Sequence, residues 1–381
     1  MKVFFRRIHL YLGLAAGLVI TFNCLTGAIL VFETELQQLF HKNRYFVTAS
    51  TQRLTADSLI HTVQQQLPNA TVNGIKFYNV DTRSAEVNIT QKPTKKSTAT
   101  VTNKKSNEGI RLTVFINPYT AKIIEVYNYR KSFFYFTMDV HRWLLAGDVG
   151  KIIVGVATII FLFILITGII LWWPKNKAVL KQRLTLKRGA GFKRLNHDYH
   201  VVLGFYSAIF LFVFAFTGLA WSFDWFNKAI YSVTNSSMER PKAPKSTILP
   251  TFKVPVEAAY QVVWGQQPNA ITYNISLPKD SAETYAVNIL AYNAPHESAT
   301  DTYFVDQYSS QIVSTQYFKD RNKGQKVRAT FKPIHVASIY GYTSKIIGFI
   351  VCLLGTFFPI SGVIMWWNRT RRKKKTNDVT A

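Results

Sequence analysis

The sequence predicts a membrane protein with an all-α core of four transmembrane helices in two parallel repeats, and with two extracytoplasmic α+β domains. Three observations predict this fold class: four long apolar runs, a bias of Lys and Arg toward the short connections, and an internal repeat. Of the 381 residues, 48% are hydrophobic and 14% are aromatic, and the apolar residues collect in runs. Runs of this length are typical of membrane proteins and not of soluble ones.

Each apolar run is long enough to cross a bilayer, which needs about 20 apolar residues in a helix. The four runs are residues 8–32, 152–173, 201–223 and 346–367, and none contains a charged residue. The first run is too long for the apolar region of a signal peptide, and no small-residue cleavage sequence follows it. We therefore expect it to remain as the first helix.

Orientation follows from the basic residues beside the runs. Lys and Arg concentrate in residues 1–7, 174–199 and 368–381, which the positive-inside rule places in the cytoplasm. The sequence thus predicts a multi-pass protein of the bacterial inner membrane, with cytoplasmic termini and two large periplasmic loops. The net charge of +26 reflects this topology. No nucleic-acid partner is expected, because the basic runs adjoin membrane ends instead of forming a patch on a soluble domain.

The predicted organisation divides the chain into eight segments. They are helix 1 at 8–32, a periplasmic domain at 33–140, a histidine segment with helix 2 at 141–173, a basic loop at 174–199, helix 3 at 200–223, a second periplasmic domain at 224–334, a second histidine segment with helix 4 at 335–367, and a basic tail at 368–381.

An internal repeat relates the two halves of the chain. Residues 9–33 align with 200–224, and residues 141–173 align with 335–367, both without a gap. Both halves begin on the cytoplasmic side, so the repeats are parallel and related by an axis along the membrane normal. A residue and its counterpart should therefore lie at the same depth and face each other across this axis.

Four of the eight histidines belong to the repeat. His9 pairs with His200 near the cytoplasmic ends of helices 1 and 3, and His141 pairs with His335 just outside helices 2 and 4. Singly, each could be an ordinary polar residue at headgroup level. As pairs facing one another, they could supply two axial imidazoles to a haem iron. We expect two haems, an inner one and an outer one.

Small residues follow each inner histidine on the same helix face, with Gly13 and Gly204 four positions on. Such a stripe suits either close helix packing or a flat macrocycle beneath an imidazole. His197 has an arginine at the matching repeat position and is a weaker candidate. Cys24 and Cys352 lie in apolar runs with no CxxCH motif, which argues against covalently attached haem.

At these residues the sequence resembles the PepSY-associated transmembrane helix family, which includes inner-membrane reductases of ferric siderophores. The motifs are Arg7-Ile8-His9 with Gly13 and Thr26-Gly27, His141-Arg142-Trp143-Leu144 with Thr167-Gly168 and Trp172-Trp173-Pro174, His200 with Gly204 and Thr217-Gly218, and His335 with Ser361-Gly362 and Trp366-Trp367. The resemblance implies two PepSY-like periplasmic domains, haem b held by the membrane histidines, and reduction of a ferric siderophore or other iron chelate to Fe(II).

An electron donor must come from outside the chain, because no G-x-G-x-x-G motif follows a strand. A haem near each face would let electrons from membrane quinol or a partner protein enter at the inner side and leave at the outer side.

Two other classes of function stay open. A regulatory or interaction protein would use the periplasmic domains without redox activity. A transporter is less favoured, because no charged residue lies at the depth of the membrane midplane. Membrane lipid is the expected partner of the four helices.

Overall fold

The structure is a computed structural model that describes residues 1–92, 109–187, 189–248 and 253–379, with side chains up to residue 371. It contains two compact units. The helical unit consists of Met1–Glu33, Phe133–Thr234 and Val327–Ala381, and the sheet unit consists of Thr34–Ser132 and Asn235–Lys326. Each unit therefore takes segments from both halves of the chain.

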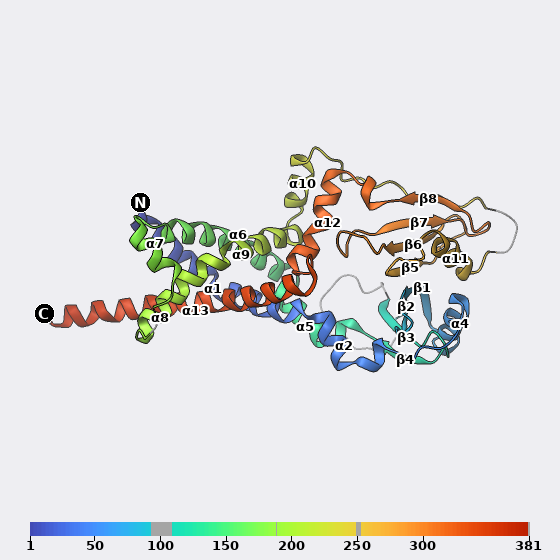
Figure 1. Cartoon of the computed structure of the whole chain (residues 1–381), viewed down its shortest axis with the longest axis horizontal. Helices are drawn as coiled ribbons and strands as arrows, with labels where there is room; N and C mark the ends of the chain where they lie inside the picture. The colour runs from blue at the N-terminus through green and yellow to red at the C-terminus, as the bar shows by residue number, and fades with distance from the viewer. Residues whose placement is uncertain (93–108, 188, 249–252, 380–381) are drawn as a thin grey trace. The chain divides into compact units, whose positions relative to one another are not determined.

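Among the described residues of the helical unit, four helices are long and apolar enough to cross a membrane: α1 (Lys2–Val31), α6 (Gly147–Trp172), the helix over Phe192–Ser222 that ends in α9, and α13 (Gly341–Val379). In Figure 1 they lie alongside one another, with α1 packed on α6 and α13, and α9 packed on the same two helices. Large apolar side chains such as Leu18, Ile166 and Ile209 remain exposed on the outside of this bundle. Lipid would cover them, as predicted for a four-helix membrane core.

The third long helix begins earlier than the sequence indicated. It runs through α8 (Phe192–Asp198), a π-helical segment (Tyr199–Leu203) and α9 (Gly204–Ser222), and so starts inside the stretch expected to be a basic loop. The same stretch also contains α7 (Lys177–Leu184). Basic side chains had suggested a loop, but long Lys and Arg side chains at a helix end can reach water while the backbone stays helical.

Three short helices flank the long ones: α5 (Phe133–Trp143), α10 (Asp224–Val233) and α12 (Lys323–His335). After α5 the backbone takes positive φ values at Leu144, Leu145 and Gly147, which end the helix and start α6 in a new direction. Each of His141 and His335 lies in the last turn of a short helix, just outside a long helix as the sequence predicted.

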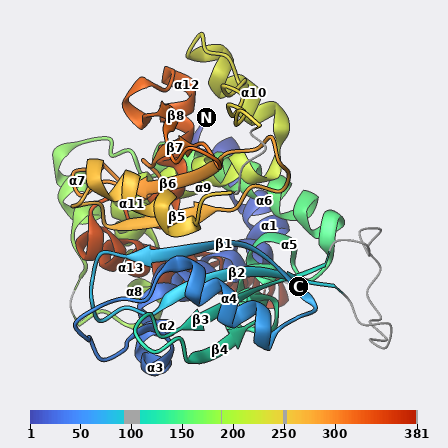
Figure 2. The ribbon, with the colours of Figure 1, turned by 90° about the vertical axis from the view of Figure 1, so that its right-hand side faces the viewer.

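The sheet unit contains one eight-stranded antiparallel sheet where the sequence predicted two separate α+β domains. The strand order is β4-β3-β2-β1-β5-β6-β7-β8, as Figure 2 shows. The strands are β1 (Ala70–Tyr78), β2 (Ala85–Gln91), β3 (Ile110–Ile116), β4 (Ile123–Tyr127), β5 (Thr272–Ser276), β6 (Tyr285–Leu290), β7 (Asp301–Val305) and β8 (Ile312–Gln316). Helices α2 (Glu33–Phe40) and α3 (Lys42–Tyr45) lead from α1 into this part of the chain.

The two halves of the sheet join where β1 pairs with β5. Ile75 lies opposite Ile275 in this pairing, and the two isoleucines hold the same place after the matching segments 68–70 and 268–270. The sheet therefore has an approximate two-fold axis through this pair. Both isoleucines are fully buried on the face that packs against α4 (Ala56–Gln66) and α11 (Val256–Gln266), so one core serves both halves.

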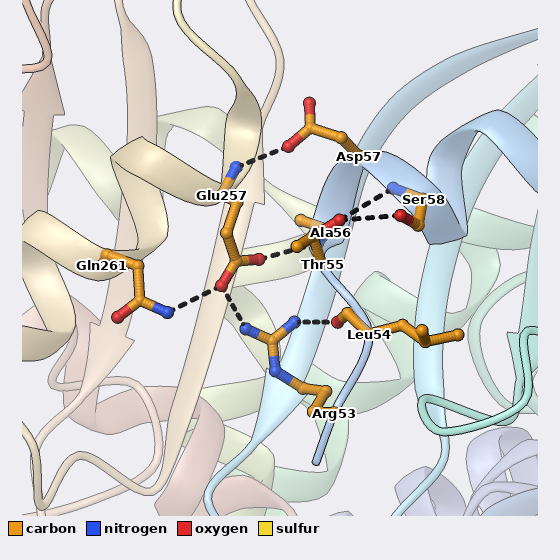
Figure 3. Close-up of polar contacts among 8 residues, drawn as sticks. All are labelled: Arg53, Leu54, Thr55, Ala56, Asp57, Ser58, Glu257 and Gln261. Atoms are coloured by element: carbon orange, nitrogen blue, oxygen red, sulfur yellow. Dashed lines mark hydrogen bonds and ion pairs between the residues drawn. The ribbon is translucent and has the colours of Figure 1, made fainter.

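The helices α4 and α11 also cap one another (Figure 3). The Asp57 carboxylate accepts hydrogen bonds from the backbone N–H groups of Val256 and Glu257, both at 2.9 Å. In return, the Glu257 carboxylate accepts one from Ala56 N at 2.7 Å and forms an ion pair of 2.6 Å with Arg53. Each helix thus satisfies N–H groups at the start of the other, where the helix dipole favours negative charge.

We expect Asp57→Ala to destabilise the first turn of α11, because it leaves two N–H groups without their acceptor. Loss of a helix cap costs about 1–2 kcal/mol, which corresponds to roughly 5- to 30-fold more frequent opening. Hydrogen exchange followed by mass spectrometry on a peptide covering 254–266 of the full chain would measure it. Ser58→Ala is the matched control, since its exposed hydroxyl contacts Thr55, the residue just before α4, and not α11. Equal exchange in the two variants would contradict the capping role.

Candidate functional site

The structure brings His9 and His200 together in the helical unit. His9 lies on α1, and His200 lies in the π-helical segment that precedes α9. The centres of the two imidazole rings are 6.4 Å apart, and the ring planes are nearly perpendicular, at 80°. A π-helical segment inside a longer helix is often found at a functional site.

His141 and His335 form a second pair of the same kind. Their ring centres are 6.1 Å apart, with an angle of 62° between the planes. Each pair takes one histidine from each half of the chain. The two pairs are those that the repeat matched.

The spacing within each pair suits a single metal ion between the rings. A metal–imidazole bond is about 2 Å long, and the ring centre lies roughly 1 Å beyond the bonding nitrogen, so opposite rings on one metal have centres about 6 Å apart. Among the described residues, no group of three or more His, Cys, Asp or Glu could hold a metal. Two protein ligands are too few for a structural zinc site, but they suffice for haem, whose ring supplies the other four ligands.

All four histidines share one pattern of hydrogen bonds. The Nδ1 atom of each lies near a hydroxyl oxygen of a neighbouring helix: Thr167 for His9 at 3.0 Å, Thr26 for His141 at 3.0 Å, Ser361 for His200 at 2.7 Å and Thr217 for His335 at 3.2 Å. Three of them also approach a backbone carbonyl oxygen: His9 that of Ile164, His141 that of Asn23 and His335 that of Phe214, at 2.9–3.1 Å.

These contacts determine which ring nitrogen carries the proton. Each of the four hydroxyls already donates its single hydrogen to a carbonyl of its own helix, as Thr26 does to Phe22 at 2.6 Å and Ser361 to Phe358 at 2.9 Å. Toward the histidine the hydroxyl can only accept, so Nδ1–H is the donor. The other nitrogen, Nε2, then keeps its lone pair, which is the tautomer that binds a metal.

A glycine follows each of these hydroxyl residues, and a histidine ring lies against it. An added Cβ would be 3.3 Å from His9 Cε1 at Gly168, 3.4 Å from His141 Cε1 at Gly27, 3.1 Å from His335 Cε1 at Gly218 and 3.8 Å from His200 Cε1 at Gly362. The sequence showed these Thr-Gly and Ser-Gly steps as repeated residues without a role. In the structure, the glycine of each of these two-residue motifs lies against the ring of one histidine.

A cavity of about 780 Å³ adjoins the His9–His200 pair, and its lining includes both histidines, Gly13 and Gly204. Its volume is within the range of about 300–1,000 Å³ that is usual for ligand sites. A Cβ at Gly13 would meet nothing within 4 Å, whereas at Gly17, one turn on, it would lie 3.2 Å from Pro359. The stripe of small residues therefore leaves open space at its start and packs against α13 further along.

Basic side chains outnumber acidic ones in the lining of this cavity. Among the described residues that line it, five are Lys or Arg and one is acidic, Asp198; the basic residues are Lys2, Arg6, Arg183, Arg194 and Arg369. Lys2 and Arg6 come from the first turns of α1, and the other three come from α7, α8 and α13. An apolar cavity with basic side chains in its lining suits a flat apolar ligand that carries carboxylates.

Two other residues that line the cavity are Trp172 and His197. Paired tryptophans at the end of a membrane helix are typical of an aromatic belt facing lipid. Trp172 is instead buried, and its ring stacks on Phe205 with centres 3.6 Å apart. Its neighbour Trp173 is exposed, as a belt residue would be. His197 also lines the cavity, but its Nδ1 lies 3.2 Å from the Asp198 carboxylate and its ring is half exposed. It is not paired with another histidine.

Electrostatics favour neutral imidazoles at the second pair, which lies on α5 and α12 outside the four long helices. Burial lowers the pKa of His141 to about 4, with a further contribution from the nearby His335. Burial likewise lowers the pKa of His335 to about 4. Both rings are thus uncharged near neutral pH, the form in which Nε2 can donate its lone pair to a metal.

Comparison with known protein families gives a match over nearly the whole chain. A family model described as PepSY-associated TM region matches residues 6–369, a range that contains all four paired histidines and their hydroxyl partners. Comparison with curated proteins gives no match.

Proposed function

The chain belongs to the PepSY-associated TM region family, as its motifs predicted, and from this premise we propose that it is a haem b-containing electron-transfer protein of the membrane. Its proposed reaction is the reduction of ferric siderophore iron to Fe(II). The observation that carries the proposal is the pair of neighbouring imidazoles, found twice, with ring centres 6.4 Å and 6.1 Å apart.

The two histidine pairs supply ligands for two haem groups. His9 and His200 would hold one, with Gly13 and Gly204 leaving room for the ring and the basic side chains of the cavity receiving its carboxylates. His141 and His335 would hold the other. Haem supplies reversible one-electron exchange at its iron, while the protein sets its potential through ligands, hydrogen bonds and burial.

The proposed substrate is Fe(III) bound by a hard-oxygen chelate outside the cell membrane. Reduction to Fe(II) weakens such a complex and lets the metal leave. The proposed donor is membrane quinol or a partner protein. Oxidation of one quinol to quinone releases two electrons and two protons, enough to reduce two Fe(III). We place the termini in the cytoplasm and the sheet unit in the periplasm, on the basis of the Lys and Arg distribution.

Purified full-length protein should carry non-covalent haem b, extractable with acid acetone, with a low-spin reduced spectrum. In sealed vesicles supplied with quinol, an impermeant ferric chelate should be reduced when it lies on the periplasmic side. A ferrous-iron indicator would measure the rate, and vesicles of the opposite orientation are the control. Colourless protein from haem-replete cells would refute the proposal and favour a regulatory role for the sheet unit.

A further inference from the structure

We propose that the hydroxyls of Thr26, Thr167, Thr217 and Ser361 are positioning groups that set the electron-donating strength of the four haem-ligating histidines. The inference rests on the proposed haem function and deepens it. It assigns a role to one hydroxyl for each histidine, so that every ligand in the chain has a defined partner on another helix.

The geometry behind this proposal occurs four times. In each case the hydroxyl belongs to a Thr-Gly or Ser-Gly step of a long helix, its hydrogen is donated within that helix, and its oxygen faces Nδ1 of a histidine from elsewhere in the chain. Packing alone would not require a polar atom at this place, since valine has nearly the same shape as threonine.

The chemical effect follows from the direction of the hydrogen bond. When Nδ1–H donates to an oxygen, the ring becomes more electron-rich and Nε2 becomes a stronger donor to the metal. A stronger donor stabilises Fe(III) relative to Fe(II) and lowers the reduction potential. Removing the hydroxyl should therefore weaken this effect and raise the potential of the haem that this histidine ligates, and of that haem alone. At His9, His141 and His335 the backbone carbonyl remains as a second acceptor.

The glycine after each hydroxyl completes the arrangement. It lets the imidazole lie within 3.1–3.8 Å of the position that a Cβ would occupy, so the ring edge lies close to the helix backbone while Nδ1 faces the oxygen. A larger residue there would push the ring away from its acceptor. The two-residue step thus fixes both the position of the ring and its tautomer.

Thr167→Val in the full-length protein tests the proposal at the His9–His200 pair, and Thr26→Val tests it at the His141–His335 pair. Redox titration followed by visible absorption should show a raised midpoint potential for one haem only, a different one in each variant. Haem affinity, measured by transfer to apomyoglobin, should fall by about 10- to 100-fold for the same haem. Thr167→Ser should restore both properties, because it restores the hydroxyl.

Matched controls lie on the same two helices. Thr158 on α6 and Thr21 on α1 also donate to the carbonyl four residues back, and within the described part of the chain neither contacts a histidine. Thr158→Val and Thr21→Val should leave both potentials unchanged. If haem-loaded Thr167→Val titrates like Thr158→Val, the positioning role is wrong while the haem proposal stands. A wild-type protein without haem would overturn both.

Discussion

His9→Ala and His200→Ala should lose the same haem, and His141→Ala and His335→Ala should lose the other. The reason is that each pair draws one imidazole from each half of the chain, with ring centres close enough to share one iron. A haem with one remaining ligand is held much less tightly, so we expect the haem content to fall by half in every variant. Reduction of a ferric chelate by quinol should fall to background in all four.

Difference spectra and redox titrations of the four variants would measure this. The two members of a pair should give superimposable spectra of the haem that remains. His197→Ala is the control: this ring lines the same cavity but pairs with Asp198, so both haems should remain. If His9→Ala resembled His141→Ala instead, each half would hold its own haem, and ligation across the halves would be wrong.

Gly13→Leu should remove the haem of the His9–His200 pair while leaving all four histidines in place. A side chain at this position enters open space in the cavity, because a Cβ there has no neighbour within 4 Å. The helix itself should tolerate leucine, which favours helical backbone more than glycine does. The expected result is a protein that folds normally, keeps the His141–His335 haem and lacks the other.

Haem content and spectra would be compared with those of Ala15→Leu. Ala15 lies two residues away on α1 with its side chain exposed, so leucine there adds the same bulk on a lipid-facing surface. Ala15→Leu should keep both haems. Equal haem content in the two variants would mean that the cavity beside His9 does not receive the ring.

Much of the helical unit could be predicted from the sequence, because a bilayer imposes a length and an apolar composition that a run of residues reveals directly. The repeat also predicted which histidines would meet. The start of the third helix at Phe192 could not be found in this way, since basic residues at a helix end resemble a basic loop. The burial of Trp172 was missed for a similar reason: aromatic residues near a membrane end suit both a belt and a core.

The join between the two halves of the sheet was also beyond the sequence. Alternating residues in β1 and β5 indicate strands with one buried face, but the pairing of one strand edge with another leaves no pattern in the side chains. The role of the Thr-Gly and Ser-Gly steps was hidden as well. Their fourfold recurrence can be seen in the sequence, but only the structure shows that each lies beside one histidine.

The pairing of Ile75 with Ile275 has a consequence for how the sheet assembles when the cell makes few copies of the protein. Two identical half-length chains would have to find each other by diffusion before such a sheet could close, and their association would depend on how many copies the cell makes. Because one polypeptide carries both halves, each meets its counterpart at an effective concentration in roughly the millimolar range, whatever the expression level. A protein made at a few copies per cell would thus be as completely assembled as one made in abundance.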